Sequence, residues 1–549
     1  MSLKPEPIGP IPDDTARVAR AAFPKGNIYM QMRDVFGAIY DDTLFAPLFA
    51  VRGRPAETPW RLALVTVMQF AEGLSDRQAA EAVRARIDWK YALGLDLTDA
   101  GFDFSVLSEF RARLVAGGAE SLLLDALLTH CTQRGYLKAR GQQRTDATHV
   151  LGALRMLSRL ECVSETLRAA LNAVAAAAPD WLRERAPTDW FARYSRRIEE
   201  YRLPKGKEAR QAYGATVGAD GIALLTALFA PTAPSSLRML PAVDILRRTW
   251  LCQYVVMEGT IRLRDPKQML PAALRMDTPY EPEARYSEKR GMGWTGYKVH
   301  LTETCDDDLP HLLTRVETTV ATETDVAHLA VIHAGLADSG LLPARQFVDA
   351  GYIRARNLVE SRVAYDIDLF GPTYEDRQWQ ARAGTGYDVA HFQIDWEAAV
   401  VTCPQGRQSI RWCPMQTARG RAMIHVDFAP ADCLTCPVRG QCTRAKRQPR
   451  SLTLLSREEH EAMQAARQRQ ETAEFATQYM RRQGIEGTLS QGVRAFGLRR
   501  ARYRGQAKTH LQHVGTAVAI NVRRVIDWRD AVPRAQTRCS HFATLALVA

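Results

Sequence analysis

Alternation between strand-like and helix-like segments is the feature that most constrains the fold of this chain. β-branched and apolar residues alternate with polar ones in several short runs, at 144–150, 296–304, 312–320, 346–349 and 365–372. The acidic turn 305–310 separates two of these runs, which therefore predict an antiparallel pair. A helical pattern at 325–341 lies before the last two runs. Strands and helices in this order predict an α/β protein built on a mixed sheet.

The N-terminal part of the chain is helical by pattern. Apolar residues recur at spacings of three and four between Trp60 and about Leu128. Ser75 is suited to begin a helix and Gly94 to end one, which gives two short helices joined by a turn. Such a pair fits a helix-turn-helix element that binds DNA, and a plain helical bundle is the structural alternative.

Two further segments carry helical patterns around and within the sheet. The Leu-, Ala- and Arg-rich stretch from about 153 to 275 predicts a helical insertion after the first strand. The sequence Ser456-Arg-Glu-Glu459 fits a capping box and predicts a last long helix that runs toward Glu486.

The longest apolar stretches, such as 169–178, are shorter than the ~20 residues of a membrane helix. The N-terminus has no apolar signal core, so a cytoplasmic protein with no membrane partner is expected.

Three acids occupy positions that suit a sheet-based metal site. Asp146 lies on the first predicted strand, Asp349 ends a later one, and Glu486 lies near the end of the last helix. Carboxylate oxygens suit Mg²⁺ and can hold two ions ~4 Å apart beside a phosphodiester. Each acid also has a structural interpretation: Asp146 could cap a turn, Asp349 could form an Asx turn with Gly351, and Glu486 could be solvated. The three in this order, with a basic run behind them, favour the metal site.

The sequence is basic, most of all after Glu486. No other carboxylate occurs before Asp527, whereas eight cations do. They are Arg494, Arg499, Arg500, Arg502, Arg504, Lys508, Arg523 and Arg524. A solvated helix face normally mixes signs, so this run predicts a polyanionic partner. The formal net charge of +12 over 549 residues points the same way.

Five of the ten cysteines crowd into one segment. Cys433 and Cys436 have the Cys-x-x-Cys spacing that presents two thiolates to one tetrahedral Zn²⁺. Cys442 is the preferred third ligand and Cys403 the preferred fourth. The alternatives for these places are Cys413 and His425. Because the segment offers few apolar anchors, a structural zinc is favoured over reduced, partly buried thiols in a loop-rich insertion.

The residues around the three acids resemble those of the DDE transposases of bacterial insertion sequences. Tyr479, Arg482 and Glu486 match the Tyr-x2-Arg-x3-Glu part of one group's signature, whereas Val493 stands where that signature has Lys and Arg494 follows it. The resemblance extends to residues 145–149, 286–300 and 347–352, and it covers the chain from about 35 to 525. The signature spacing i, i+3 and i+7 places its three residues on one face of a helix, where Arg482 would clamp a phosphate oxygen. Gly484 and Gly487 would either end that helix or let DNA approach closely.

The resemblance implies an RNase H-like catalytic core and a transposase that binds the terminal inverted repeats of its own element. Asp146, Asp349 and Glu486 would bind two Mg²⁺ ions, with Mn²⁺ as a substitute, and Tyr479 and Arg482 would support them. Metal-activated water would cut the DNA, and the freed 3′-OH would then be joined to target DNA in transposition. The implied partners are double-stranded DNA, as terminal repeats and target, and a second copy of the chain in the active complex at the bacterial nucleoid.

These patterns together predict a domain order. It comprises a flexible N-terminus (1–27), a helical DNA-binding domain (28–135), the first core strand (136–152), a helical insertion (153–284), core strands and a helix (285–372), a Cys-rich insertion (373–455), C-terminal core helices with the basic segment (456–530), and a tail (531–549). Two other functions stay open from the sequence: a transposase-derived DNA-binding regulator without catalysis, and an RNase H-like nuclease that cuts without joining.

Overall fold

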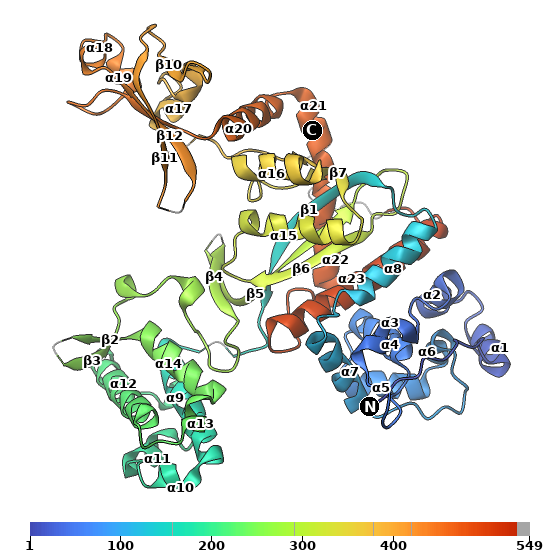
Figure 1. Cartoon of the computed structure of the whole chain (residues 1–549). Coiled ribbons are helices and arrows are strands. Elements are labelled where there is room, and N and C mark those ends of the chain that lie inside the picture. The colour runs from blue at the N-terminus through green and yellow to red at the C-terminus, as the bar shows by residue number, and fades with distance from the viewer. Residues whose placement is uncertain (156, 258, 290, 377, 419, 535–549) are drawn as a thin grey trace, which may run out of the picture. The chain divides into compact units, whose positions relative to one another are not determined.

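The chain folds as a mixed α/β protein, as its alternating pattern predicts (Figure 1). The computed structural model describes residues 1–534 except Met156, Glu258, Arg290, Arg377 and Arg419, so the predicted tail lies outside the described residues from 535 onward. The chain divides into two compact units. The first contains Met1–Lys138, Asp146–Glu323 and the chain from Ile485 onward, and the second contains Ala139–Thr145 and Thr324–Gly484.

In the first unit, a long central strand organises the sheet. The strands are the later part of β1 (Arg140–Leu151), β4 (Arg285–Lys289), β5 (Met292–Thr304) and β6 (Leu313–Val320). β5 lies between β4 and β1 and also pairs with β6. The antiparallel register of β5 and β6, from Tyr297 opposite Val320 to Glu303 opposite Leu313, confirms the predicted pair. Gly296 is required on β5, because a Cβ there would lie 2.2 Å from the Val150 carbonyl oxygen.

In the second unit, short parallel strands carry the sheet. The early part of β1 pairs in parallel with β7 (Pro343–Phe347), and β7 pairs in parallel with β8 (Asp368–Phe370). The helices α15 (Asp325–Asp338) and α16 (Ala355–Tyr365) pack on them through a buried cluster that includes Ile332, Val348 and Leu369. The predicted helix at 325–341 is confirmed. The predicted strand at 346–349 ends earlier, at Phe347, so Asp349 lies in the loop that follows.

Helices form the N-terminal region of the first unit. They are α1 (Asp13–Ala22), α2 (Ile28–Phe36), α3 (Asp42–Phe45), η1 (Ala46–Leu48), α4 (Pro59–Glu72), α5 (Asp76–Ala85), α6 (Ile87–Leu93), α7 (Ser105–Ala116) and α8 (Leu122–Gln133). Ser75 caps α5 in a capping box with Gln78, and Gly94 ends α6 with a left-handed φ of 62°. The expected flexible N-terminus instead contains α1, whose buried Thr15 donates a hydrogen bond to the Leu95 carbonyl.

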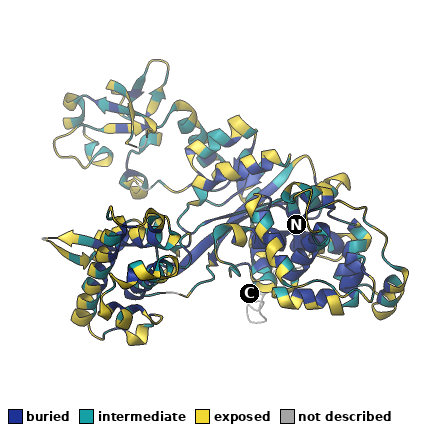
Figure 2. Ribbon diagram, turned by 60° about the horizontal axis from the view of Figure 1, so that its bottom comes forward, coloured by how far each residue is buried: buried dark blue, intermediate teal, exposed yellow. Residues whose placement is uncertain are grey.

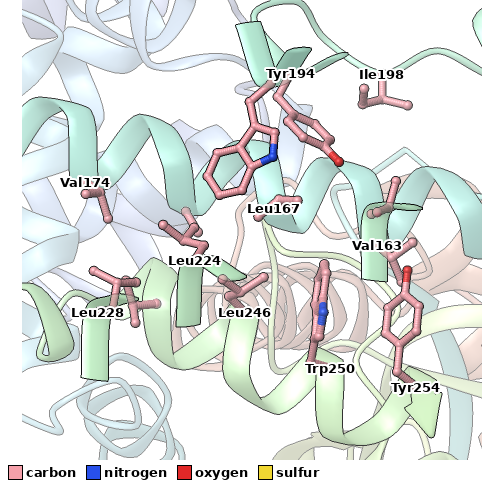
Figure 3. Close-up of a cluster of buried hydrophobic side chains, with 14 of the residues drawn as sticks. Val163, Leu167, Val174, Tyr194, Ile198, Leu224, Leu228, Leu246, Trp250 and Tyr254 are labelled. Carbon is pink, nitrogen blue, oxygen red and sulfur yellow. The ribbon is translucent and has the colours of Figure 1, made fainter. Parts of the chain in front are cut away.

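The predicted helical insertion is also part of the first unit. It contains α9 (Arg159–Ala177), α10 (Pro179–Arg183), α11 (Thr188–Tyr194), η2 (Glu200–Arg202), α12 (Lys207–Phe229), α13 (Ser235–Arg238) and α14 (Pro241–Gln253). A β-hairpin of β2 (Tyr254–Met257) and β3 (Thr260–Leu263) follows, and the helical pattern did not predict it. The short helices η3 (Pro266–Gln268) and η4 (Ala272–Leu274) lead to β4. Figure 3 shows the hydrophobic cluster that joins these helices.

Helix α12 is the one described helix that is long and apolar enough to cross a membrane by length and composition. α12 is 23 residues long, which is longer than the uninterrupted apolar stretches considered from the sequence. Its glycines and polar residues divide it into shorter apolar runs, so the sequence did not reveal its length. Those glycines have a packing role: Trp250 Nε1 donates to the Gly218 carbonyl and the Tyr254 hydroxyl to the Gly214 carbonyl, both at 2.9 Å. Any Cβ at Gly221 would lie 2.1 Å from the Trp250 ring. One such helix, packed against the core of the insertion, is weak evidence for a membrane.

The Cys-rich segment of the second unit has a small hydrophobic core of its own, although most of its residues are exposed or half-buried (Figure 2). Its elements are α17 (Trp379–Ala383), η5 (Val389–His391), β9 (Gln393–Asp395), β10 (Val400–Thr402), β11 (Ser409–Gln416), β12 (Ala422–Phe428), α18 (Pro430–Leu434), α19 (Arg439–Cys442) and β13 (Ser451–Leu454). β11, β12 and β13 form an antiparallel sheet, and β9 pairs with β10. The buried residues are Phe392, Val401, Val426, Phe428, Leu452 and Leu454. The expectation of few apolar anchors was therefore wrong.

The last predicted helix is divided into several. α20 (Arg457–Gln470) begins at Ser456, whose side chain accepts from the Glu459 N–H as predicted. α21 (Ala473–Tyr479), the 3-10 helix η6 (Met480–Gln483), α22 (Gly484–Phe496) and α23 (Gln506–Arg529) follow. Glu486 therefore lies in the first turn of α22 and not near the end of a long helix. α23 packs against β6 and against the N-terminal helix α4 within the first unit.

Candidate functional site

Asp146 is fixed by the regular backbone of β1. Its side chain is buried, with 9% of the residue exposed, and Oδ1 accepts a hydrogen bond from the Ala147 N–H at 2.7 Å. The structural alternative of a turn cap is excluded, because the residue lies in the interior of a strand. A buried carboxylate in a rigid strand is a well-positioned ligand for a cation.

Asp349 lies two residues beyond the end of β7, and a second acid lies close to it. Its Oδ1 accepts the Gly351 N–H at 2.8 Å, which is the Asx turn considered from the sequence. Any Cβ at Gly351 would lie 2.8 Å from Asp349 Oδ1 and 3.2 Å from Oδ2 of Asp325, the first residue of α15. Sequence reasoning took Asp325 only as the start of a helix. The two carboxylates thus border a space that a larger residue at 351 would fill.

Glu486 projects from the first turn of α22 and is exposed. The positive end of the helix dipole stabilises a carboxylate there. The buried face of α22 is formed by Ile485, Thr488, Leu489 and Gly492.

Asp146 and Glu486 belong to the first unit and Asp349 to the second. Among the residues that the structure describes, no group of three or more His, Cys, Asp or Glu side chains is arranged to hold a metal ion. Each of the three carboxylates supplies ligand chemistry that suits a hard divalent cation.

A buried ion pair anchors α22, the helix of Glu486. Glu303 on β5 has a fully buried side chain and accepts from Arg524 Nη1 and from the Thr488 hydroxyl, both at 2.6 Å. Arg524 on α23 also donates to Thr488 at 2.6 Å and to Gln491 at 3.2 Å. Thr488 is two residues from Glu486, so this network fixes the helix that carries the acid. In the sequence Arg524 belongs to the basic run, whereas in the fold it pairs with a buried carboxylate.

Tyr479 and Arg482 lie before α22 in the second unit. The Tyr479 ring stacks on Phe475 with a centroid distance of 5.4 Å, and Phe475 stacks on Phe370 at 4.8 Å. The signature tyrosine thus ends an aromatic stack that begins on β8. Arg482 lies in the 3-10 helix η6. The signature residues therefore do not share one face of a single continuous α-helix, because the tighter 3-10 turn changes their angular spacing.

The two glycines beside Glu486 have different environments. Arg144 on β1 donates to the Arg481 carbonyl at 2.6 Å, and its guanidinium covers Gly484. A Cβ at Gly484 would lie 2.0 Å from Arg144 Nη1, so packing against Arg144 explains this glycine. Gly487 has open space around it. Arg144 was not predicted as a site residue, although it lies two residues before Asp146.

The basic run is used partly for packing. Arg499 Nε donates to the Thr148 hydroxyl at 2.8 Å, and Arg502 donates to the Leu74 carbonyl and lies over the Phe70 ring. Arg523 pairs with Asp527 at 2.9 Å. Besides Arg523, which pairs with Asp527, the exposed members of the run are Arg494, Arg500, Arg504 and Lys508. These exposed side chains are the ones available to a polyanion.

The four preferred zinc ligands line one pocket of about 190 Å³ in the Cys-rich segment: Cys403, Cys433, Cys436 and Cys442. Burial raises the pKa of the Cys442 thiol, Arg450 opposes this shift, and the neighbouring cysteines add to it. The alternative ligands Cys413 and His425 instead face each other across β11 and β12. The four preferred cysteines thus line the same pocket, and their role as zinc ligands stays a prediction.

Comparison with known families gives two matches. A family model described as a transposase DDE domain matches residues 402–526, a range that contains Glu486, and a model described as a transposase domain (DUF772) matches residues 17–113. No curated protein and no solved structure matches the chain. The two matched ranges lie at opposite ends of the chain and leave Asp146 and Asp349 outside both.

Proposed function

The chain is an insertion-sequence DDE transposase, and we propose that it binds the terminal inverted repeats of its own element and catalyses metal-dependent cleavage and strand transfer. The observation that carries this proposal is the transposase DDE match over the range that contains Glu486. Asp146, buried on the central sheet, and Asp349, in the loop after a parallel strand, supply the other two acids.

An RNase H-like core is the proposed form of this sheet. It is supported by the antiparallel pair β5 and β6, and by the parallel pairing of β1 with β7 and of β7 with β8. In the proposed core Asp146 comes from β1 and Asp349 from the loop after β7.

DDE transposase domains generally use divalent metals, and two Mg²⁺ ions, with Mn²⁺ as a substitute, are proposed for this chain. The donor set fits, because Asp349 and Asp325 present carboxylate oxygens to the space above Gly351 and hard oxygen ligands suit Mg²⁺. Asp146, Asp349 and Glu486 would hold the ions. When bound, such ions activate the attacking oxygen and stabilise charge on the phosphate. The chain's own residues hold these acids in place through β1, the Asx turn and the Glu303 network.

The proposed partner is double-stranded DNA, as terminal repeats and as target. The exposed residues Arg494, Arg500, Arg504 and Lys508, together with the N-terminal helices, support this proposal by charge and by the family match over 17–113. A homodimer in the active complex follows from the need to join two element ends. Action in the bacterial cytoplasm stays a prediction of the sequence.

A structural Zn²⁺ in the Cys-rich segment is a further part of the proposal. The convergence of four cysteines on one pocket supports it. Zinc would tie the Cys433–Cys442 segment to the loop that carries Cys403.

The test is cleavage and joining of a labelled terminal-repeat duplex in Mg²⁺. Asp146→Asn, Asp349→Asn and Glu486→Gln should each lose most cleavage and joining while the gel shift of the same duplex persists, and the losses should not multiply in double variants. Glu208→Gln, an exposed acid on α12, is the matched control and should keep full activity. Joining by Glu486→Gln at the unmodified rate would contradict the triad. Binding without any cleavage by the unmodified protein would identify a DNA-binding regulator, and cleavage without joining would identify a nuclease.

A further inference from the structure

A pocket lined by four arginines lies in the helical insertion, in a part of the chain that neither family match covers. Its volume is about 630 Å³, and its lining includes Arg193, Arg196, Arg197 and Arg202. Ile198, Leu203 and Tyr213 form its apolar part. This volume exceeds what a lone small anion needs, so the pocket suits a larger polyanionic group.

The arginines of this pocket are only partly neutralised by acids. Arg193 pairs with Asp220 at 3.0 Å and with Asp189 at 3.6 Å. Arg197 lies 3.5 Å from Glu199 with 57% of its side chain exposed. In the described part of the chain, no carboxylate lies within ion-pair distance of Arg196 or Arg202. The pocket therefore keeps an excess of positive charge at its exposed rim.

Two buried residues anchor the segment that carries these arginines to the core of the insertion. Tyr194 and Ile198 are buried in the hydrophobic cluster of the insertion, where Figure 3 shows both side chains above α9. The Tyr194 hydroxyl donates to Asp220 at 2.6 Å, and the Ile198 N–H donates to the buried Glu165. Because both neighbours are anchored, the backbone that carries Arg196 and Arg197 is held in place before a ligand binds.

Exposed aromatic rings flank the basic pocket. Tyr201 is 73% exposed and Phe191 is 57% exposed, and each is next in sequence to a residue that lines the pocket. The guanidinium of Arg202 lies over the Tyr201 ring, 5.3 Å from its centroid, and its Nε donates to the Tyr201 hydroxyl at 3.0 Å. A basic groove beside solvent-exposed rings is the arrangement by which proteins hold single-stranded nucleic acid, because bases stack on the rings and phosphates bind the cations.

We propose that this pocket is a second DNA-binding site, which takes backbone phosphates of DNA with an unpaired base stacked on Tyr201. The inference rests on the proposed function, since an enzyme that opens DNA ends meets unpaired nucleotides. The site is distinct from the basic run after Glu486, which lies on other elements of the first unit. Arg196, Arg197 and Arg202 bind the phosphates, and Tyr201 gives the site its preference for unpaired bases.

The experiment measures binding of the full-length protein to a labelled terminal-repeat duplex, either blunt or with a 3′ single-stranded overhang, over a range of salt concentrations. The combined variant Arg196→Gln, Arg197→Gln and Arg202→Gln should reduce the slope of log K against log salt by about 2 for the overhang duplex, since each phosphate on a single strand contributes about 0.7. Tyr201→Ala should reduce the preference for the overhang several-fold with little change of slope. Thermal unfolding of each variant shows whether it is folded.

The matched control is Arg247→Gln with Arg248→Gln, two exposed arginines of α14 in the same insertion that pair with Asp244. This control should keep the slope of the unmodified protein. An unchanged slope in the pocket variant, or an equal reduction in the control, would overturn the second site. If the unmodified protein binds neither duplex, the proposed function itself fails, and the two failures are thereby distinguished.

Discussion

Removing Arg524 should destabilise the first unit strongly, because it leaves the Glu303 carboxylate buried without its cation. The Glu303 side chain is 0% exposed and that of Arg524 is 18% exposed, with 2.6 Å between Arg524 Nη1 and Glu303 Oε2. Breaking a buried ion pair from one side costs about 3–5 kcal/mol, because the remaining charge stays desolvated. Arg524→Met keeps much of the side-chain volume and should therefore lower the free energy of unfolding by about that amount.

The neighbouring residue Arg523 provides a matched control on the same helix. It pairs with Asp527 at 2.9 Å, but its side chain is 55% exposed, and such surface pairs contribute only about 0–1 kcal/mol. Arg523→Met should therefore change stability little. The double variant Arg524→Met, Glu303→Gln removes the charge on both sides and should recover part of the loss.

The assay is chemical denaturation followed by tryptophan fluorescence, together with cleavage of the terminal-repeat duplex. Because Thr488 is bound by both Glu303 and Arg524 and lies two residues from Glu486, the folded fraction of Arg524→Met should also cleave more slowly. If Arg524→Met and Arg523→Met unfold at the same denaturant concentration, the argument that this ion pair anchors α22 is refuted.

Three other predictions follow from the described contacts. Cys433→Ser or Cys436→Ser should release zinc and expose the Cys-rich segment to proteolysis, whereas Cys413→Ser should do neither. Elemental analysis of protein purified without chelator measures the bound zinc, and the absence of stoichiometric zinc would contradict the site. Stability should fall as the pH drops below about 6.5, because burial lowers the pKa of His513 to about 3 and also lowers the pKa of His510 and His333, so the unfolded chain takes up protons that the folded chain does not. His513 alone should contribute about 1 kcal/mol of this loss between pH 7.5 and pH 5.5. Melting curves at these two pH values on His513→Gln, which should flatten the dependence, check this contribution. Replacing Arg500, Arg504 and Lys508 by Gln should reduce the slope of log K against log salt for duplex binding by about 3. Arg502→Gln should instead lower the melting temperature, because Arg502 donates to the Leu74 carbonyl. An unchanged melting temperature in Arg502→Gln would contradict this packing role.

Local sequence signals predicted local structure well. Ser75, Gly94 and Ser456 mark helix ends through backbone hydrogen bonds that depend on a few adjacent residues, and all three predictions are confirmed. The antiparallel pair β5 and β6 is confirmed for a similar reason, since a short turn joins two alternating runs. Helix ends and hairpins of this kind are determined by residues close in sequence, so they can be predicted without knowing which distant residues are in contact.

Features that depend on distant residues were missed. Arg144 and Gly484 are far apart in sequence, and only the fold shows that the guanidinium of one occupies the place of a side chain on the other. Asp325 was missed because a helix start explained it fully, and its proximity to Asp349 arises from packing of α15 beside the loop after β7. The division of the last helix at η6 was missed because helical periodicity continues across a 3-10 turn with little change.

The basic run shows how a composition argument overstates a binding surface. Its eight cations suggested a single polyanion-binding stretch, but Arg524 is committed to a buried carboxylate and Arg523 to Asp527. Arg499 and Arg502 hold loop segments through hydrogen bonds to Thr148 and Leu74. Only four exposed cations of the run are left for DNA, and these would contribute a salt slope of about −3.6 on duplex DNA. A steeper measured slope therefore requires phosphate contacts elsewhere, and the arginine pocket of the helical insertion and the N-terminal helices are the parts of the chain from which we expect them.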